Sequence, residues 1–321
     1  MLLIKKLAMV VVLVMLPIVD SSLEEKHIGR SDKYDGFIYN GFKDASSDFS
    51  FGNSVADITS TGLLRITNSF DGAYQMGFAF YSHPLRFKNV KQNSSSTISS
   101  EGNNTSTSVS VFSFSSSFIF SIVPESPGLP GLGMGFVIAR KLPGLGPKAS
   151  DLHGMFNSTQ DREPTTHTLA VELDTLYNKD FDDIDGDHVG IDLNNLTSVT
   201  SKPSGYYTDQ NGSYRNLSLI SGDPIRVWIE YDGVSKNLSV TLAPLTMPKP
   251  VTPLLSYNLD LSDILLDSMY VGFSASTSLV QTSHYILGWS VMINNGTALP
   301  INLSQLPELP SKEQKSKVPR S

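Results

Sequence analysis

The sequence contains no cysteine among its 321 residues. This absence excludes a disulfide framework, a thiolate metal site, a cysteine nucleophile and thiol redox chemistry. Basic residues are also scarce, with 24 Lys and Arg against 31 Asp and Glu, so the formal net charge is −7. Nucleic acid binding relies on basic side chains that neutralise phosphates, and we therefore expect no nucleic acid partner. Apolar residues make up 40% of the chain, which is enough for one large core.

The long apolar run of the chain lies at its N-terminus, where Lys5 and Lys6 precede the apolar residues 7–19. A basic start, a run of this length and then small or polar residues are typical of a secretory signal peptide, and we expect residues 1–22 to be one. The alternative is a buried first strand. No later run is long and apolar enough for a membrane helix, so we expect a soluble, secreted, extracellular chain without membrane insertion.

Ten Asn-x-Ser/Thr sequons agree with export, because several of them would carry glycans on surface loops of an exported eukaryotic protein. They are Asn93, Asn103, Asn104, Asn157, Asn195, Asn211, Asn216, Asn237, Asn295 and Asn302.

Two polar segments differ in composition from the rest of the chain. Residues 92–110 are predicted to form a solvated loop, and residues 304–321 are predicted to form a flexible tail.

Most of the remaining chain shows the alternation of apolar and polar residues that is typical of β-strands. Between Phe112 and Ile122 the apolar residues follow a period of two, with Ile119 alone out of phase. Further strands are predicted at 76–81, 134–139, 169–173, 189–193, 227–231, 238–242, 269–275 and 284–291. No segment has a convincing helical period. Many short strands joined by polar loops predict an all-β protein, with one antiparallel β-sandwich over residues 23–303.

Carboxylates concentrate between Val171 and Asp192. Glu172 and Asp174 face away from the apolar set of one predicted strand, and His188 faces away from the apolar set of the next. We expect these side chains to converge beside the acidic loop that joins the two strands. Like charges this close repel one another unless a cation neutralises them. Oxygen ligands suit Ca²⁺, and an added histidine suits a transition ion such as Mn²⁺.

Three other interpretations of this segment compete with a metal site built on the two strands. A solvated acidic loop explains the aspartates, but not the strand-borne pair or the histidine. An EF-hand would need Phe181 as its first ligand and flanking helices, and is rejected. A glycosidase of the E-x-D-x-E type needs a carboxylate at position 176, where this chain has Leu176. The sequence therefore favours a binding protein over an enzyme.

The chain resembles the legume-type (L-type) lectin domains of plants from about Phe37 to Val291, and the resemblance implies their jelly-roll sandwich. It rests above all on a metal motif that this sequence matches at every step, namely Glu172, Asp174, Asn178, Asp183 and His188. In that family, a transition ion, usually Mn²⁺, is held by the counterparts of Glu172, Asp174, Asp183 and His188. A Ca²⁺ ion is held by the counterparts of Asp174, Asn178 and Asp183 with the carbonyl of residue 176, here Leu176. The resemblance therefore implies one structural ion of each kind.

Residues 295–310 resemble the end of the ectodomain of plant lectin receptor kinases, whose membrane helix and kinase are missing from this sequence. The resemblance implies a carbohydrate-binding protein of the apoplast or cell wall that recognises a glycan or glycoprotein, in defence or in cell-wall recognition. Family members often pair through sheet edges, which makes a homodimer an expectation. The ions would catalyse nothing, but would form the ligand loops before the sugar arrives and so reduce the ordering cost of binding.

The positions expected at the sugar site depart from the family pattern. They are Leu132, Gly133, Leu176, Asn178, Ser278 and Leu279. Leu132 stands where family members have an aspartate that accepts hydrogen bonds from two sugar hydroxyls, so a charge-assisted contact is lost. Leu176 stands where an aromatic ring would stack on the sugar, while Asn178 is retained. The alternative function is a lectin-like module that has lost simple-sugar binding and recognises an apolar ligand, a complex glycan or a protein partner.

Overall fold

The computed structural model describes residues 35–52, 55–93, 106–126, 128–129, 131–142, 166–208, 212–294 and 297–310. One large antiparallel sheet, the first sheet, contains β1 (Asp35–Tyr39), β3 (Asp57–Ile58), β4 (Leu64–Thr67), β9 (Phe114–Pro124), β16 (Ile225–Asp232), β17 (Asn237–Pro244), β18 (Leu255–Asn258) and β20 (Thr282–Ile293). The second sheet contains β2 (Phe49–Gly52), β5 (Met76–Tyr81), β6 (Leu85–Arg86), β10 (Met134–Ala139), β11 (Thr168–Asp174), β12 (His188–Leu193), β13 (Ser198–Pro203) and β19 (Ser268–Ser276).

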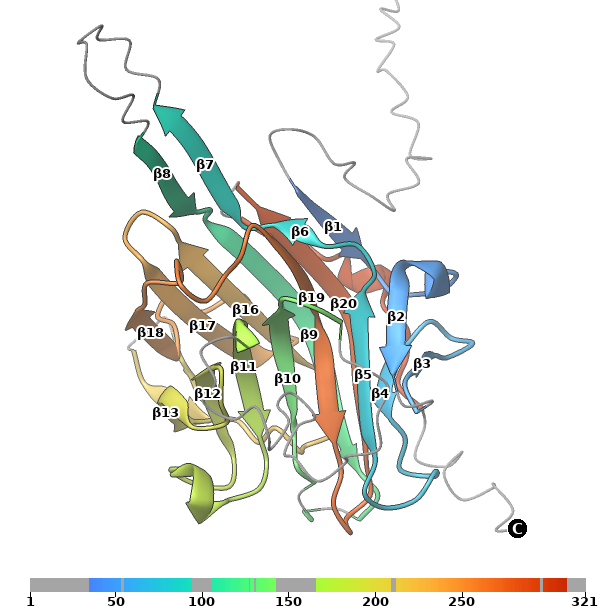
Figure 1. The fold of residues 1–321 in the computed structure, drawn as a ribbon. Coiled ribbons are helices and arrows are strands. Elements are labelled where there is room, and N and C mark those ends of the chain that lie inside the picture. The colour runs from blue at the N-terminus through green and yellow to red at the C-terminus, as the bar shows by residue number, and fades with distance from the viewer. Residues whose placement is uncertain are drawn as a thin grey trace, which may run out of the picture.

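The two sheets stack face to face as a sandwich (Figure 1). The strand order of the first sheet is β18-β17-β16-β9-β20-β4-β3, with β1 also paired to β20. The order of the second sheet is β13-β12-β11-β10-β19-β5-β2, with β6 also paired to β19. The prediction of an all-β antiparallel sandwich is confirmed. The predicted signal peptide, residues 1–22, lies outside the described residues.

Aromatic side chains fill the space between the two sheets. Phe118 of β9 stacks on Phe136 of β10, with ring centroids 6.1 Å apart, and its centroid lies 5.0 Å from that of Phe273 of β19. Phe273 also meets Trp289 of β20 edge to face at 4.7 Å. The indole Nε1 of Trp289 donates to the hydroxyl of Ser116 at 3.0 Å, so this buried N–H is paired by a serine that the period-two pattern places inward.

The outer face of the first sheet carries a second apolar cluster, in which the out-of-phase Ile119 packs with Leu63, Tyr285, Leu287 and Ile301. Leu306 and Leu309 pack against this cluster. They follow the helical turn η5 (Leu303–Gln305) and fall within the segment predicted as a flexible tail. The structure differs from that expectation over residues 304–310, because apolar side chains at long intervals find a ready-made surface on the sheet. Residues 311–321 lie outside the described residues.

Two small hairpins complete the fold. One pairs β7 (Lys88–Asn93) with β8 (Ser106–Val111) and projects from the upper end of the sandwich in Figure 1. The polar segment predicted as a loop over residues 92–110 therefore begins and ends in strands. The other hairpin pairs β14 (Gly205–Tyr207) with β15 (Tyr214–Asn216). The other described helical turns are η1 (Ser46–Asp48) and η4 (Lys179–Phe181), and no helix in the described residues is long and apolar enough to cross a membrane.

Four loops meet at one end of the sandwich, at the bottom of Figure 1. The register places the end of β11 beside the start of β12 and the start of β10, and the start of β10 beside the end of β19. The end of β19 in turn lies beside the start of β5. The loops 68–75, 175–187 and 277–281 and the described residues of 125–133 therefore lie together, and we call this end of the molecule the loop end.

Candidate metal and carbohydrate site

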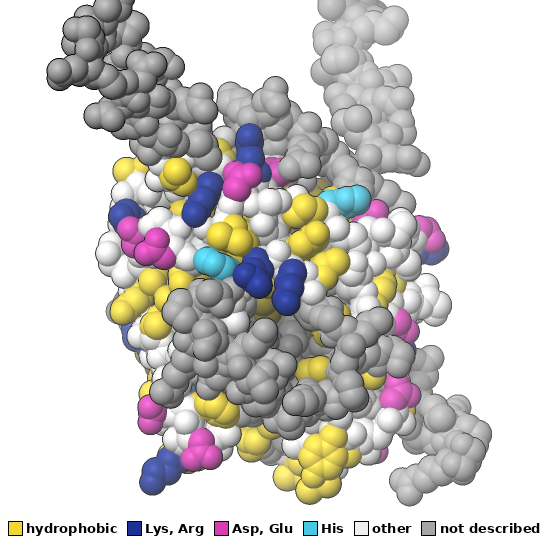
Figure 2. All heavy atoms as spheres, viewed as in Figure 1, with side chains coloured by type: hydrophobic (Ala, Val, Ile, Leu, Met, Phe, Trp, Pro, Cys, Tyr) yellow, Lys and Arg dark blue, Asp and Glu magenta, His cyan; other side chains and the backbone are white. Residues whose placement is uncertain are grey.

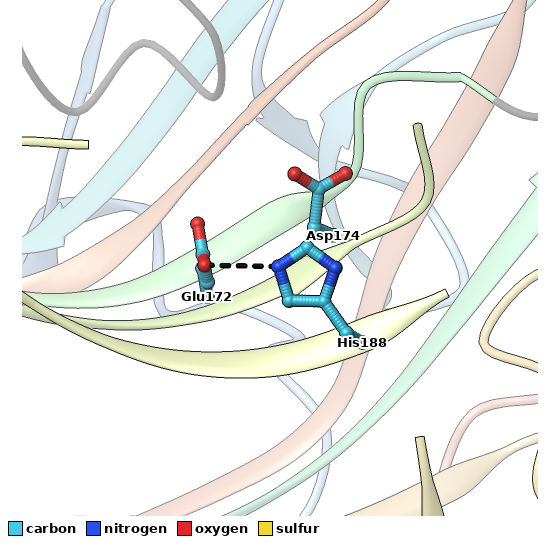
Figure 3. A group of neighbouring side chains, drawn as sticks. All are labelled: Glu172, Asp174 and His188. Atoms are coloured by element: carbon cyan, nitrogen blue, oxygen red, sulfur yellow. Dashed lines mark hydrogen bonds and ion pairs between the residues drawn. The ribbon is translucent and has the colours of Figure 1, made fainter. Parts of the chain in front are cut away.

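Three ionisable side chains converge on the outer face of the second sheet, next to the loop end. Asp174 of β11 lies opposite His188 of β12 in the register, and Glu172 lies two residues earlier on the same face of β11. One ligand atom from each of the three lies within 4.8 Å of the others, and all three residues are buried. Figure 3 shows both carboxylates and the imidazole gathered over neighbouring strands. The convergence predicted from the alternating pattern is present.

The imidazole of His188 is oriented by two contacts. Its Nδ1 lies 2.9 Å from the backbone oxygen of Asp185, and its Nε2 lies 3.3 Å from Oε1 of Glu172. A carbonyl oxygen only accepts, so Nδ1 carries the hydrogen of that bond and Nε2 faces the carboxylates. Metal-binding histidines are held in the same way by a carbonyl acceptor on the far nitrogen.

The buried charges raise the pKa values of the cluster. Burial, aided by the charge of Glu172, raises the pKa of Asp174 to about 8. Burial lowers the pKa of His188, but the hydrogen bond and charge of Glu172 outweigh it and raise this pKa to about 9. The metal-free cluster therefore retains protons near neutral pH. A divalent cation would take the place of those protons, because it neutralises the same carboxylates.

Asp192 and Ser198 complete the cluster, and the sequence reasoning did not assign them. Asp192 of β12 is fully buried, and burial raises its pKa well above the usual value. The hydroxyl of Ser198 lies 2.6 Å from Oε1 of Glu172 and 2.7 Å from Oδ1 of Asp192. A hydroxyl has one hydrogen to donate, so one of the two carboxylates must donate a proton to the other short contact, and the raised pKa of Asp192 favours that residue. The signal was available for Asp192, which shares the period-two face of His188.

Gly190 of β12 leaves room for the side chains of Glu172 and Ser198. A Cβ atom added at this position would lie 2.0 Å from Oγ of Ser198 and 2.3 Å from Oε1 of Glu172. These separations are far below van der Waals contact. The glycine is therefore required by the close approach of the carboxylate and the hydroxyl over β12.

The loop that follows β11 folds around its own acidic side chains. The backbone N–H of Asn178 donates to Oδ2 of Asp183 at 2.6 Å, and the N–H of Leu176 donates to Oδ1 of Asp174 at 2.7 Å. The side-chain oxygen of Asn178 accepts from the N–H of Asp180 at 2.9 Å and caps η4. Asp183 lies outside the group of three, although the charges of His188 and Glu172 act on its pKa, which burial raises.

These residues fit the two ions that the sequence implies. Two carboxylates and an imidazole nitrogen, with Asp183 close enough to feel their charge, form a donor set suited to a transition ion such as Mn²⁺. The oxygens of Asp174, Asp183 and Asn178 and the carbonyl of Leu176 are hard donors that suit Ca²⁺. Burial raises the pKa values of Asp174 and Asp192, and a cation bound at these residues would favour their ionised forms.

The residues expected at the sugar site all lie at the loop end. Gly133 is buried with φ +90°, in the left-handed region that favours glycine, and its carbonyl accepts from the N–H of Ser276 at 3.4 Å. Leu132 and Leu176 are half-buried, and Leu279 is 73% exposed. The backbone oxygen of Ser278 accepts a hydrogen bond from the N–H of Tyr74 at 3.0 Å, and this bond joins the loops 68–75 and 277–281.

Comparisons with known proteins agree with the family resemblance of the sequence. The pattern of the family described as "Legume lectin domain" matches residues 34–308. "L-type lectin-domain containing receptor kinase V.9" of Arabidopsis thaliana is 43% identical over 267 residues, which cover 83% of this chain and 37% of that protein. "L-type lectin-domain containing receptor kinase IV.1" of the same plant is 41% identical over 281 residues, 87% of this chain and 38% of that protein. The chain thus spans less than two fifths of these relatives.

A solved structure described as "Peanut lectin with 9mer peptide (PVIWSSATG)" superposes with a TM-score of 0.60 at 25% identity, covering 83% of this chain and 99% of that one. A second, "Lotus tetragonolobus seed lectin (Isoform)", gives a TM-score of 0.61 at 23% identity over 83% of this chain and 100% of that one. The second likeness shows the fold alone. Both agree with the sandwich described above.

Proposed function

The chain belongs to the legume lectin family, and from that premise we propose that it is a secreted, metal-dependent carbohydrate-binding protein with one structural Ca²⁺ and one structural Mn²⁺. The observation that carries the proposal is the buried group of Glu172, Asp174 and His188, whose charges call for a cation. The fold of a lectin alone would not require this cluster to be intact.

In the proposed arrangement Mn²⁺ binds to Glu172, Asp174, Asp183 and His188. Ca²⁺ binds to Asp174, Asn178 and Asp183 and to the carbonyl of Leu176. The ions hold the loop 175–187 against the sheet, so that the binding surface is formed before the ligand arrives. The protein binds and does not catalyse, because the position that a two-carboxylate glycosidase would need is Leu176.

For sugar recognition we propose that Asn178 is the main polar contact. Its side-chain oxygen accepts from Asp180, which leaves the amide nitrogen as the donor to a sugar hydroxyl. Leu132, Gly133, Leu176, Ser278 and Leu279 line the surrounding loops. Sites of this kind combine a few fixed polar groups with an apolar surface for the C–H face of the ring.

A second candidate function follows from Leu132, which is half-buried at the position of the family's sugar-binding aspartate. A leucine accepts no hydrogen bond, and losing one charge-assisted contact costs on the order of 1.5–3 kcal/mol, or about ten- to a hundredfold in affinity. The candidate is a lectin-like module that recognises an apolar ligand, a complex glycan or a protein and no longer binds simple sugars. Ordinary binding of free mannose, glucose or galactose would contradict it.

Export to the apoplast or cell wall, glycosylation, a role in defence or in cell-wall recognition, and a homodimer belong to the same proposal. The described sequons are compatible with glycans, since Asn216 and Asn302 are exposed and Asn195 and Asn237 are half-buried. Asn93 ends β7. The sequons that lie outside the described residues are Asn103, Asn104, Asn157, Asn211 and Asn295.

Elemental analysis and a glycan array test the proposal together. We expect about one Ca and one Mn per chain after dialysis against trace metal, and array binding that disappears in EDTA and returns with the two ions. Asp174→Asn should lose both the metals and the binding. Asp180→Asn is the matched control, because Asp180 is exposed in the same loop and is not among the proposed ligands. Metal-free protein that binds glycans as well as loaded protein would overturn the proposal.

A further inference from the structure

Arg226 of β16 lies on the outer face of the first sheet, on the opposite side of the sandwich from Glu172 and His188. It pairs with Ile119 of β9 and with Ala243 of β17, and Ile119 belongs to the apolar cluster on this outer face. Figure 2 shows the side of the second sheet instead, where basic and acidic side chains are interspersed. Arg226 is half-buried, whereas most arginines in the described ranges are exposed. Its burial calls for an explanation, because charged side chains are seldom removed from water without a partner.

The guanidinium of Arg226 is held by two neighbours. Its Cζ lies 4.8 Å from the centroid of the Trp228 ring, which follows two residues later on the same face of β16. Its Nε donates to the hydroxyl of Ser117 of β9 at 3.2 Å. Both neighbours are almost fully buried, which limits the orientations open to the planar group.

No carboxylate of the described residues neutralises Arg226. Burial lowers the pKa of its guanidinium, and no neighbouring charge in the described part of the chain acts against this effect. A guanidinium carries five N–H groups, and among the described residues the bond to Ser117 is the one that uses any of them. The two terminal nitrogens are therefore available as donors to another molecule.

Arg65 shows how the same sheet holds an arginine that is paired within the chain. It lies on β4, opposite Tyr285 of the outer apolar cluster, and is also half-buried. Its Nε and Nη2 donate to the two carboxylate oxygens of Asp57 at 2.8 and 2.7 Å. This is the bidentate pairing that the guanidinium geometry favours. At Arg226, a carboxylate from outside the chain would complete the same pattern.

Hydroxyl side chains form a row beside this guanidinium. Trp228 pairs with Ser117 of β9 and with Thr241 of β17. Ser117 in turn pairs with Ser290 of β20, so the three hydroxyls lie across the same face of the sheet. The hydroxyl of Ser290 is buried and has no hydrogen-bond partner among the described residues. Buried hydroxyls are nearly always paired, so an unpaired one indicates a place for an ordered water or a ligand group.

We propose that Arg226 is the centre of a second binding site, which takes the carboxylate of an acidic sugar, a uronate. The terminal nitrogens of the guanidinium donate to the two carboxylate oxygens, while Trp228 and Ser117 keep it in position. The row of hydroxyls meets the hydroxyl groups of the sugar, directly or through ordered water. The inference goes beyond the proposed function, because this site needs neither the metal ions nor Asn178.

Charge and backbone geometry select this ligand. One guanidinium matches one planar, singly charged carboxylate, whereas a phosphate carries more charge than a single cation neutralises. The other charged residue on this face of β16, Glu230, is already bound to Lys249 at 2.5 Å. β16 is paired on both sides, so an acidic peptide could not bind there by adding a strand, and the net charge of −7 would repel its further carboxylates. A sugar ring needs only side-chain groups.

Titration calorimetry in EDTA, at physiological salt, tests the proposal with trigalacturonate and with its methyl ester, which keeps the rings but removes the charge. We expect the acid to bind on the order of tenfold or more tightly than the ester, because a charge-assisted bidentate contact is gained. In Arg226→Gln this ratio should fall to about one. Arg226→Lys keeps the charge but not the planar fork, and should retain only part of the ratio.

Arg65→Gln is the matched control, since it removes the same charge from the same face of the sheet and should keep the ratio of the wild type. Acid and ester that bind equally, including the case in which neither binds, overturn the site. Acetate or an acetylated triglutamate peptide that binds as tightly as trigalacturonate overturns the assignment to a sugar. Equal loss in Arg65→Gln also overturns the site, because the effect would then come from net charge. Whether the protein is a metal-dependent lectin is decided separately, by the glycan array with and without EDTA.

Discussion

Asp174 lies directly opposite His188 across β11 and β12. Because side chains alternate between the two faces of a sheet, a slip of one residue in this register would turn one of them into the core. Leu173 and Val189 are the neighbouring pair, and both are completely buried on the opposite face. The same apolar alternation that fixes the register of these strands therefore also brings the two ligands together.

The pH dependence of stability should differ in sign between the metal-free and the loaded protein. Burial raises the pKa of Asp174 from 3.8 to about 8, and Glu172 raises that of His188 from 6.5 to about 9 against the effect of burial. The folded metal-free chain then binds protons that the unfolded chain releases. Its stability should fall as pH rises from about 4 to 9. Melting temperatures in EDTA between pH 5 and 9 check this.

Protein saturated with Ca²⁺ and Mn²⁺ should show the opposite trend in acid, because the ions need deprotonated ligands. Its melting temperature should rise from pH 5 to 7, so that the gap between the loaded and the metal-free protein widens. Parallel curves for the two forms would contradict a cation on these residues.

Ser198→Ala should weaken binding of the transition ion by roughly tenfold or more, since partners that orient a ligand are worth ten- to a hundredfold in metal affinity. The variant removes the hydroxyl that lies 2.6 Å from Glu172. Competition with a chromophoric chelator measures the change. Ser201→Ala, on the same strand, is the control and should bind Mn²⁺ as the wild type does.

Gly190→Ala should disrupt the cluster directly. The added Cβ would lie 2.3 Å from Oε1 of Glu172, so the carboxylate and the strand must move. We expect a loss of on the order of 1–3 kcal/mol in unfolding free energy, as for other overpacked sites, and a loss of Mn in elemental analysis. Gly186→Ala, whose Cβ would come no closer than 3.2 Å to a neighbour, should have a much smaller effect. Equal effects at the two positions would argue against crowding at Glu172.

Ile301→Ala should destabilise the sandwich from outside its core. Ile301 is 4% exposed and packs on the outer face of the first sheet with Ile119. Truncating a buried isoleucine costs about 2–5 kcal/mol, with the lower part of the range expected at a surface cluster that can partly collapse. Leu303→Ala is the control, since Leu303 is 45% exposed and should change stability by less than about 0.5 kcal/mol. Urea unfolding compares the two.

Much of the sandwich could be predicted from the sequence, because one buried face imposes a period of two. The predicted strands at 76–81 and 134–139 coincide with β5 and β10, and the one at 284–291 lies within β20. Even the exception was informative, since Ile119, out of phase in sequence, packs in the cluster on the other side of its sheet. Glu172, Asp174 and His188 could be predicted because alternation along a strand fixes the face toward which each side chain points. This prediction needs no knowledge of the partner strand.

Other features depend on contacts that a single sequence does not reveal. Ser198 of β13 reaches Glu172 of β11 over the intervening β12, where the pairing of β12 with β13 shifts register between Ile191 and Asp192, and no local pattern predicts that shift. Leu306 and Leu309 lie in a polar, proline-rich stretch, and only the apolar cluster on the outer face of the first sheet gives them a place to pack. The rigidity of residues 68–75 comes from one glutamine, Gln75, whose three side-chain hydrogen bonds are set by the three-dimensional path of the loop.

The packing of residues 301–309 on the first sheet has a consequence for assembly. Ile301 and Leu306 press so closely on β20 that a Cβ at Gly288 would lie 3.0 and 2.8 Å from them. This part of the sheet is thus already occupied by the chain's own C-terminal residues. A second copy that tried to stack on the same area would have to peel them away and expose Leu287 and Tyr285. Two copies would associate at lower cost by extending a sheet sideways, strand against strand.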